Sequence, residues 1–294
     1  MRLSREQAVA IASRLGLNSD RLEIKSVSGG DTSPTFRLVC GEVAVFVKTA
    51  DGGQADMLDC EADGLQALAE TGCLRVPAIL GQGLVEDSNR AWLALEALNL
   101  RPRNAAADRV LGQQLAAVHN CTGERYGWSR DNFLGRNRQA NRPAADWSDF
   151  FCNQRLRPQI EQLQSSHPGM ISSVLTDRAL QRWSALCRHH HQPPPSLLHG
   201  DLWSGNASCL ADDCPVVYDP AVHYGDAECD LAMAELFGGF SDDFFLAYAK
   251  ARPLSPGWRQ RRVFYQLYHL LNHANLFGGG YLNRVRAELE RVNC

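Results

Sequence analysis

The first hundred residues alternate between two hydrophobic periods. Between Ser4 and Gly16 the apolar residues recur at the spacing of one helical face, and Ser4 is a residue suited to cap that helix. Residues 36–47 change to a period of two around a glycine-containing turn, which predicts a β-hairpin. Residues 57–68 return to helical spacing, and residues 92–95 form a short apolar run typical of a strand.

Beyond residue 100 the helical period dominates. Apolar stripes recur at helical spacing in residues 110–118, 175–187 and 258–276, and the glycines at 278–280 separate the last stripe from one more helix. A mixed helix-and-strand segment followed by a helical one predicts an α+β molecule. We expect two lobes.

The change of pattern also predicts the domain organisation. Residues 1–98 would form a small lobe built on an antiparallel sheet, and residues 99–294 a mainly helical lobe. A chain of 294 residues is long enough to bury a core in each of them.

Composition and charge exclude some classes of protein. A net charge of -3 leaves no basic excess for counterion release, so we expect no nucleic-acid partner. No apolar run is long enough for a spanning helix, and the polar start MRLSREQ lacks a secretory signal, so we expect no membrane partner. The ten cysteines are scattered without a CxxC pair, which indicates reduced thiols and a cytoplasmic protein, and argues against a cysteine-rich metal or redox protein.

Candidate chemistry begins in the predicted small lobe. Gly29 and Gly30 lie in a turn before the hairpin, Lys48 ends its second strand, and Glu61 lies in the helix that follows. Alone, a strand-end lysine is usually a solvated side chain and a helical glutamate usually a surface residue. Their order along the chain is more informative than either residue.

The predicted large lobe supplies the complementary carboxylates. The sequence LLHGDLWSGN places Asp201 and Asn206 five positions apart, the spacing of a kinase catalytic loop, in which the aspartate accepts or orients the attacking hydroxyl and the asparagine ligates Mg²⁺. Asp219 follows the β-branched pair of VVYDP, which indicates a strand that delivers a second metal ligand to its end. Together with a lysine for the phosphates, these residues predict phosphoryl transfer from ATP with Mg²⁺, in which positioning and electrostatics provide most of the acceleration.

At this point the chain resembles a known family. HGDLWSGN, YDPAVHYGDAECDLAMAELFGGF and the segment FVK are similar to the most characteristic stretches of the fructosamine kinase family, and the similarity covers nearly the whole chain. The resemblance implies the bilobal protein-kinase-like fold that this family shares with aminoglycoside phosphotransferases.

The resemblance also implies roles for individual residues. Lys48 and Glu61 would form the small-lobe ion pair, Asp201 would be the catalytic base, and Asn206 and Asp219 would be the metal ligands. The backbone from Glu96 to Leu98 would be the inter-lobe hinge that hydrogen-bonds adenine, and Asp230 would brace the catalytic loop. The implied activity is phosphorylation of the sugar O-3′ of ketosamines, free or as glycated proteins. Because the product is unstable, the amine is then released.

Acceptor residues are less firmly indicated. Trp203 lies inside the catalytic loop and could pack against a sugar ring, and Asp131, with Asn132 and Phe133, could approach the acceptor. The alternatives are a kinase of the same fold acting on an aminoglycoside or a choline-like alcohol, and a nucleotide-binding pseudokinase. The sequence leaves open the preferred sugar and the choice between monomer and homodimer.

Several other groups have structural interpretations. The three histidines at 189–191 are expected in a solvated helix end rather than a metal site, and His269 and His273 are expected in a core or interface because HLLNH lacks the glutamate of HExxH. Trp147 and the phenylalanines at 150 and 151 have helical spacing and are expected in the core.

Overall fold

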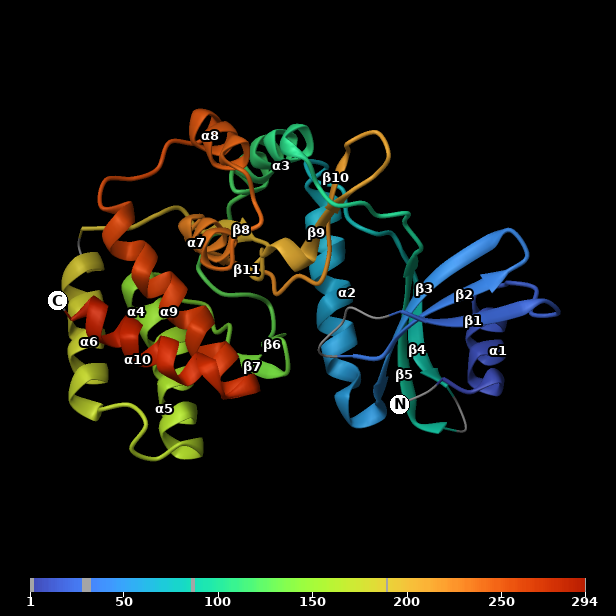
Figure 1. The fold of residues 1–294 in the computed structure, drawn as a ribbon, viewed down its shortest axis with the longest axis horizontal. Coiled ribbons are helices and arrows are strands. Elements are labelled where there is room, and N and C mark those ends of the chain that lie inside the picture. Colours follow the sequence, from blue (N-terminus) through green and yellow to red (C-terminus); the bar gives the residue numbers. More distant parts are fainter. Residues whose placement is uncertain (1–2, 28–32, 86–87, 189, 294) are drawn as a thin grey trace.

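The small lobe is a twisted five-stranded antiparallel sheet with a helix on each side. The computed structural model describes residues 3–27, 33–85, 88–188 and 190–293. In spatial order the strands are β1 (Leu22–Val27), β2 (Thr35–Cys40), β3 (Val43–Asp51), β5 (Arg90–Glu96) and β4 (Ile79–Val85). The two helices are α1 (Arg5–Arg14) and α2 (Ala55–Glu70), and α2 lies between the sheet and the rest of the molecule (Figure 1).

Local sequence explains the start of this lobe. The Ser4 hydroxyl accepts a hydrogen bond from the Gln7 amide at 3.1 Å, and the Gln7 side chain accepts one from the Ser4 amide at 3.0 Å, which confirms the predicted cap. The predicted hairpin is β2–β3, joined where Gly41 has a φ of 65°. The sequence did not indicate strand β1, because this edge strand is mostly exposed and its apolar alternation stops after Leu22 and Ile24.

The large lobe is mainly helical, as predicted. Its helices are α3 (Ala105–Val118), α4 (Trp147–Phe151), α5 (Arg157–Ser166), α6 (Ser173–Cys187), α7 (Glu228–Leu236), α8 (Asp242–Ala251), α9 (Trp258–Phe277) and α10 (Gly280–Val292). Its short strands pair as β6 (Asn132–Leu134) with β7 (Asn137–Gln139), β8 (Ser196–Leu198) with β11 (His223–Gly225), and β9 (Ala207–Cys209) with β10 (Pro215–Val217). None of the helices in the described ranges is long and apolar enough to cross a membrane.

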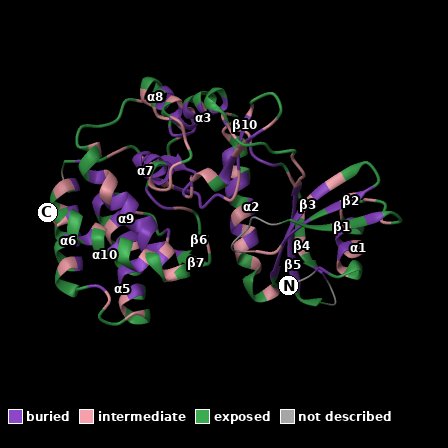
Figure 2. Cartoon of the chain, in the orientation of Figure 1, coloured by how far each residue is buried: buried purple, intermediate pink, exposed green. Residues whose placement is uncertain are grey.

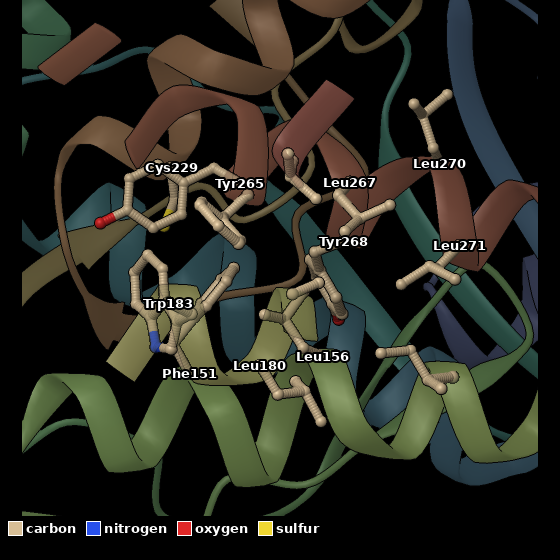
Figure 3. Close-up of a cluster of buried hydrophobic side chains, with 14 of the residues drawn as sticks. Phe151, Leu156, Leu180, Trp183, Cys229, Tyr265, Leu267, Tyr268, Leu270 and Leu271 are labelled. Carbon is tan, nitrogen blue, oxygen red and sulfur yellow. The ribbon is translucent and has the colours of Figure 1, made fainter. Parts of the chain in front are cut away.

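Helix α9 is the centre of the large-lobe core. It is buried along most of its length (Figure 2), and Figure 3 shows Tyr265, Tyr268 and Leu271 of this helix among side chains of α6 and of the segment around α4. Trp147, Phe150 and Phe151 are each no more than 2% exposed, which confirms their predicted place in the core. A rigid core behind α9 fixes the helix whose far end reaches the site described below.

A second core joins the two lobes. Leu65 of α2 and Leu93 of β5 belong to the same buried cluster as Leu115 of α3 and Val217 of β10. Burial of apolar area contributes about 25 cal/mol per Å², so this cluster holds α2 firmly against the large lobe. Within α2, Gly64 lets the backbone approach the loop after β10, because a Cβ there would lie 3.0 Å from the Pro220 side chain.

One expectation about the histidines was wrong. His191 is buried, and its Nε2 atom lies 2.6 Å from Asp226 Oδ2, which also accepts a hydrogen bond from Tyr265 at 2.6 Å. His190 is exposed, and His189 lies outside the described residues. The sequence could not show this because the partners come from segments more than thirty residues away.

The same cluster could be mistaken for a metal site. Ligand atoms of His191, Asp226 and Glu228 lie within 4.8 Å of one another. However, the Arg261 guanidinium binds both oxygens of Glu228, at 2.6 and 2.7 Å, and so already supplies the positive charge. The cluster is therefore a buried hydrogen-bond and ion-pair network, and the nine cysteines of the described ranges are free.

Candidate active site

Lys48 lies between two carboxylates that come from different lobes. Its Nζ atom is 2.6 Å from Glu61 Oε1, and it also donates a hydrogen bond to Asp219 Oδ1. Strand β3 positions the lysine, α2 the glutamate, and the loop after β10 the aspartate. The lysine side chain is only 7% exposed, so its ammonium is held in one place by charge and by burial.

Asp201 and Asn206 face each other across one turn of the loop between β8 and β9. The Asn206 Nδ2 group donates to Asp201 Oδ2 at 3.0 Å and to the Asp201 carbonyl at 2.9 Å. These bonds use the amide nitrogen of Asn206, which directs its Oδ1 atom away from Asp201. The five-residue spacing seen in the sequence thus becomes a direct contact.

Asp230 fixes the backbone at the start of the loop between β8 and β9. Its two carboxylate oxygens accept hydrogen bonds from the His199 and Gly200 amides, at 2.7 and 2.8 Å, and His119 lies 3.1 Å from the first of these oxygens. Gly200 has a φ of 81°, and a Cβ atom there would lie 2.1 Å from the Ala221 carbonyl oxygen. A carboxylate with three partners and a glycine at the tightest point define the shape of this loop.

Burial controls the protonation of the site carboxylates. It raises the pKa of Asp201 to about 7, with a further contribution from the Asp219 charge and an opposing one from the Asn206 hydrogen bond. Burial also raises the pKa of Glu61 to about 7 against the effect of Lys48. For Lys48 itself burial acts to lower the pKa, but Asp219 and Glu61 together outweigh it, so the pKa is raised and the ammonium persists.

The charges in this site are not balanced by the protein. Glu61, Asp201 and Asp219 bring three carboxylates, whereas Lys48 is the one ammonium among the described residues that line the cavity. The oxygens of Asp219 and Asn206 are hard donors of the kind that Mg²⁺ prefers. These residues therefore fit a divalent cation, which would relieve the repulsion that contributes to the raised pKa of Asp201.

The polar residues line a cavity of about 290 Å³. From the small lobe and the catalytic loop it takes Lys48, Glu61, Asp201, Asn206 and Asp219. The rest of the lining includes aromatic and amide side chains of the large lobe, namely Asn132, Phe133, Trp203, Phe237, Asn272, His273, Phe277 and Tyr281. The predicted acceptor residue Trp203 is thus in the wall, and His273 also lines the cavity, whereas His269 is buried.

Other predicted residues lie elsewhere. Asp131 is exposed and is not among the lining residues of the described ranges; its carboxylate accepts a hydrogen bond from the Asn141 amide at 3.0 Å. Glu96 is the last residue of β5 and Leu98 follows it; neither is among the described residues that line this cavity, and the Glu96 carboxylate binds Arg75 at 2.5 Å. Adenine binding by this hinge stays a prediction. Gly29 and Gly30 lie outside the described residues.

A buried amide network, which the sequence did not indicate, supports the β6–β7 hairpin that carries Asn132 and Phe133. Asn132 donates to the Val222 carbonyl at 2.7 Å and accepts from Gln139 and Asn141, at 2.8 and 2.9 Å. Arg155, from a π-helical turn at Cys152–Leu156, donates to Asn141 Oδ1 at 2.6 Å. Amides scattered over the chain give no periodic signal, so the sequence offered no clue to this network, and the π-helical turn that carries Arg155 is visible only in the structure.

The fold and the site together define the class of this protein. A five-stranded lobe carrying a lysine–glutamate pair, packed on a helical lobe carrying the Asp201 loop, is the bilobal arrangement of the protein-kinase-like enzymes, and the chain is an ATP-dependent kinase. The model of the fructosamine kinase family matches residues 4–293. The chain belongs to the fructosamine kinase family.

Individual relatives agree with this assignment. A protein of Synechocystis named "Probable ketoamine kinase" is 40% identical, over 92% of this chain and 90% of its own. A Thermobifida fusca crystal structure described as a "putative fructosamine-3-kinase" is 31% identical with a TM-score of 0.80, covering 96% of this chain and 98% of its own. One from Haemophilus somnus reaches a TM-score of 0.86 at 29% identity, covering 97% and 96%.

Proposed function

We propose that this enzyme is a ketosamine 3-kinase, which transfers the γ-phosphoryl group of ATP to the sugar O-3′ of glycated amines or proteins. The observation that carries the proposal is the single cavity that holds Lys48, Asp201, Asn206 and Asp219 beside an acceptor wall, in a member of this family. Relatives named as ketoamine kinases support a sugar–amine adduct as the acceptor. The unstable 3-phosphate then decomposes and frees the amine, so the proposed role is deglycation.

In the proposed reaction each protein group has one task. Asp201 accepts the proton of the sugar hydroxyl as the oxygen forms its bond to the γ-phosphorus, and the bond from that phosphorus to the bridging oxygen of ADP breaks. Lys48, held by Glu61, supplies a fixed positive charge to the phosphates. Asn206 keeps Asp201 oriented through the 3.0 Å hydrogen bond to its Oδ2 atom.

We propose Asn206 and Asp219 as the ligands of Mg²⁺. When bound, the ion neutralises phosphate charge during the transfer. Asp219 has a φ of 57°, a left-handed conformation that costs a non-glycine residue about 1–2 kcal/mol. Aspartate adopts this conformation more readily than most residues, and Asp213 does so in an exposed turn, so the support for a role beyond packing is the pairing of Asp219 with Lys48 in the cavity lining.

The charge of the acceptor wall argues against a polycationic acceptor. Among the described residues that line the cavity, the carboxylates are Glu61, Asp201 and Asp219; Glu61 and Asp219 pair with Lys48, and Asp201 is the proposed base. An aminoglycoside carries several ammonium groups, which need acidic partners in the acceptor site. A kinase acting on a choline-like alcohol is the second candidate, because aromatic rings can also bind a quaternary ammonium.

An assay of ADP release with ATP, Mg²⁺ and a panel of acceptors tests the proposal. We expect turnover on fructosamines, ribulosamines or erythrulosamines and a product phosphorylated at O-3′. Turnover on an aminoglycoside or choline with none on a ketosamine would contradict it, and nucleotide binding without turnover on any acceptor would favour a pseudokinase. Asp201→Ala should lower kcat at least about 100-fold. ATP binding should remain.

Three further features complete the proposal. We place the lobe boundary between residues 98 and 99, with Glu96 and Leu98 as the adenine-binding hinge. We also propose that Gly29 and Gly30, which lie outside the described residues, bind the nucleotide. We also place the enzyme in the cytoplasm, because free cysteines suit a reducing compartment.

A further inference from the structure

Five aromatic rings of the large lobe meet in the wall of the cavity. We call them the aromatic corner: Trp203, Phe237, His273, Phe277 and Tyr281. All five line the cavity. Phe237 connects them, with ring centroids 4.8 Å from His273 and 6.4 Å from both Trp203 and Tyr281.

The chain brings these rings together from three separate segments. Trp203 comes from the catalytic loop, Phe237 follows α7, and the other rings come from the junction between α9 and α10. At that junction Gly278 and Gly279 have φ values of 61° and 55°, so the chain turns sharply between the two helices. As a result the rings of Phe277 and Tyr281 lie 6.1 Å apart.

The corner is not an ordinary part of the core. Phe277 is 51% exposed, and the other four rings are half-buried, in contrast to the fully buried rings around Trp147. Apolar surface left open beside a catalytic cavity is stabilised when a ligand covers it. The corner therefore has the features of a binding surface.

The corner begins at Trp203, two residues after Asp201 in the same loop, which indicates which part of the acceptor it meets. If O-3′ of the sugar lies at Asp201, the amine nitrogen is attached two carbons further along, at C-1, and its substituent extends beyond it. We infer that the aromatic corner binds this amine and its substituent, and that the enzyme prefers ketosamines whose amine carries an aromatic or apolar group. The inference rests on the proposed function, and it adds a determinant of acceptor choice.

The chemistry of the corner fits this ligand. A protonated secondary amine is attracted to the faces of aromatic rings, by about 0.5–2 kcal/mol depending on its exposure to water. An aromatic substituent stacked on Phe277 adds about 0.5–1.5 kcal/mol. The Arg284 guanidinium already lies over the Phe237 and Tyr281 rings, 5.4 and 6.0 Å from their centroids, so within the corner Trp203 and Phe277 offer ring faces to the amine and its substituent.

Kinetics with two ketosamines of the same sugar test the inference. One is made from benzylamine and the other from methylamine, and the quantity compared is the ratio of their kcat/KM values. We expect Phe277→Ala to lower this ratio about tenfold and Tyr281→Phe to preserve it. The control is Leu246→Ala, which removes an apolar side chain that is 67% exposed on α8 and outside the cavity lining.

The possible outcomes separate the two proposals. An unchanged ratio in both Phe277→Ala and Tyr281→Ala would overturn the aromatic corner as the amine subsite, even if the wild-type enzyme phosphorylates both compounds. If the wild-type enzyme phosphorylates neither compound, the result would contradict the proposed function instead. In that case calorimetric Kd values for the same two compounds still test the corner, since the ratio of Kd values should change in the same way.

Discussion

At the scale of single residues, the site contains charged groups in buried positions, where burial disfavours the charged form. In the proposed mechanism Asp201 must be ionised to accept a proton, yet burial raises its pKa to about 7. A base whose pKa is near the working pH is ionised in a large fraction of the molecules and still binds the proton strongly enough to remove it from the acceptor. The same burial makes ionised Asp201 unfavourable for folding.

Replacement of Asp201 by asparagine should therefore stabilise the protein at alkaline pH. A carboxyl whose pKa is raised on folding contributes stability that is fully present below its unfolded pKa of about 4, and this contribution is lost as the pH rises through about 7. The amide side chain of the Asp201→Asn variant cannot ionise, so it avoids this loss. In thermal unfolding without ligand, the variant should have the higher Tm at pH 8, by a few degrees, and the gap should close toward pH 4. A gap that widens toward acid pH would contradict this assignment.

Gly200→Ala should disrupt the catalytic loop. The left-handed φ of 81° costs an alanine about 1–2 kcal/mol, and its Cβ would also lie 2.1 Å from the Ala221 carbonyl oxygen. The loop must then move, so we expect kcat to fall at least about tenfold together with a loss of Tm. Gly16→Ala is the matched control, because its φ is 69° and no atom lies within 4 Å of the added Cβ. It should lose about 1 kcal/mol of stability and keep its activity. Equal behaviour of the two variants would show that the loop tolerates a side chain.

At the scale of elements, the part of the cavity wall formed by the β6–β7 hairpin depends on hydrogen bonds made by irregular segments. The β6–β7 hairpin has strands of only three residues, so its own ladder is short. Arg155 supports the hairpin from the π-helical turn: its guanidinium binds the Ala140 carbonyl at 2.5 Å and Asn141 Oδ1 at 2.6 Å. It is 1% exposed and lies over the Phe150 ring at 4.6 Å.

Arg155→Lys should weaken acceptor binding selectively. A lysine keeps the positive charge but cannot reach both acceptors with one planar group. The hairpin that carries Asn132 and Phe133 should then be less well placed, so we expect the KM for the acceptor to rise about tenfold while the KM for ATP changes little. Arg157→Lys, an exposed position on the following helix, is the control. A similar rise of both KM values would indicate general destabilisation instead.

At the scale of the whole molecule, the active site is also a connection between the lobes. Lys48 of the small lobe pairs with Asp219 of the large lobe, and the core shared by α2, β5 and α3 also joins the two lobes. A nucleotide with its metal ion binds across the same junction in the proposed mechanism. Ligand binding and lobe stability should therefore be linked.

Thermal unfolding with ADP and Mg²⁺ tests this link. At a ligand concentration one hundred times Kd, the folded state gains about 2.7 kcal/mol, so the Tm should rise by a few degrees and return on addition of EDTA. Asp219→Asn should lose most of this rise. Asp213→Asn is the control, because Asp213 also has a left-handed φ, of 61°, but lies in an exposed turn. A full rise in Asp219→Asn would argue against Asp219 as a metal ligand.

The sequence by itself determined the features that depend on local periodicity and spacing. The capped first helix, the β2–β3 hairpin, α2 and the helical large lobe follow from hydrophobic periods, and the order of Lys48, Glu61, Asp201 and Asp219 predicted a kinase. These features could be predicted because hydrophobic period depends only on neighbouring residues, and because lysine, glutamate and aspartate at these spacings indicate phosphate and metal binding. The family resemblance then covered nearly the whole chain and was confirmed.

The tertiary structure decided what depends on partners distant in the chain. Strand β1 is stabilised by pairing with β2, and buried His191 is stabilised by its contact with Asp226. The conformation of the segment around Asp131 leaves that residue outside the described cavity lining. The aromatic corner likewise joins Trp203 to residues at 237 and 273–281, which have no shared period. Local preference determines an element, whereas only packing determines which side chains face one another across a cavity, and that is the information that acceptor choice requires.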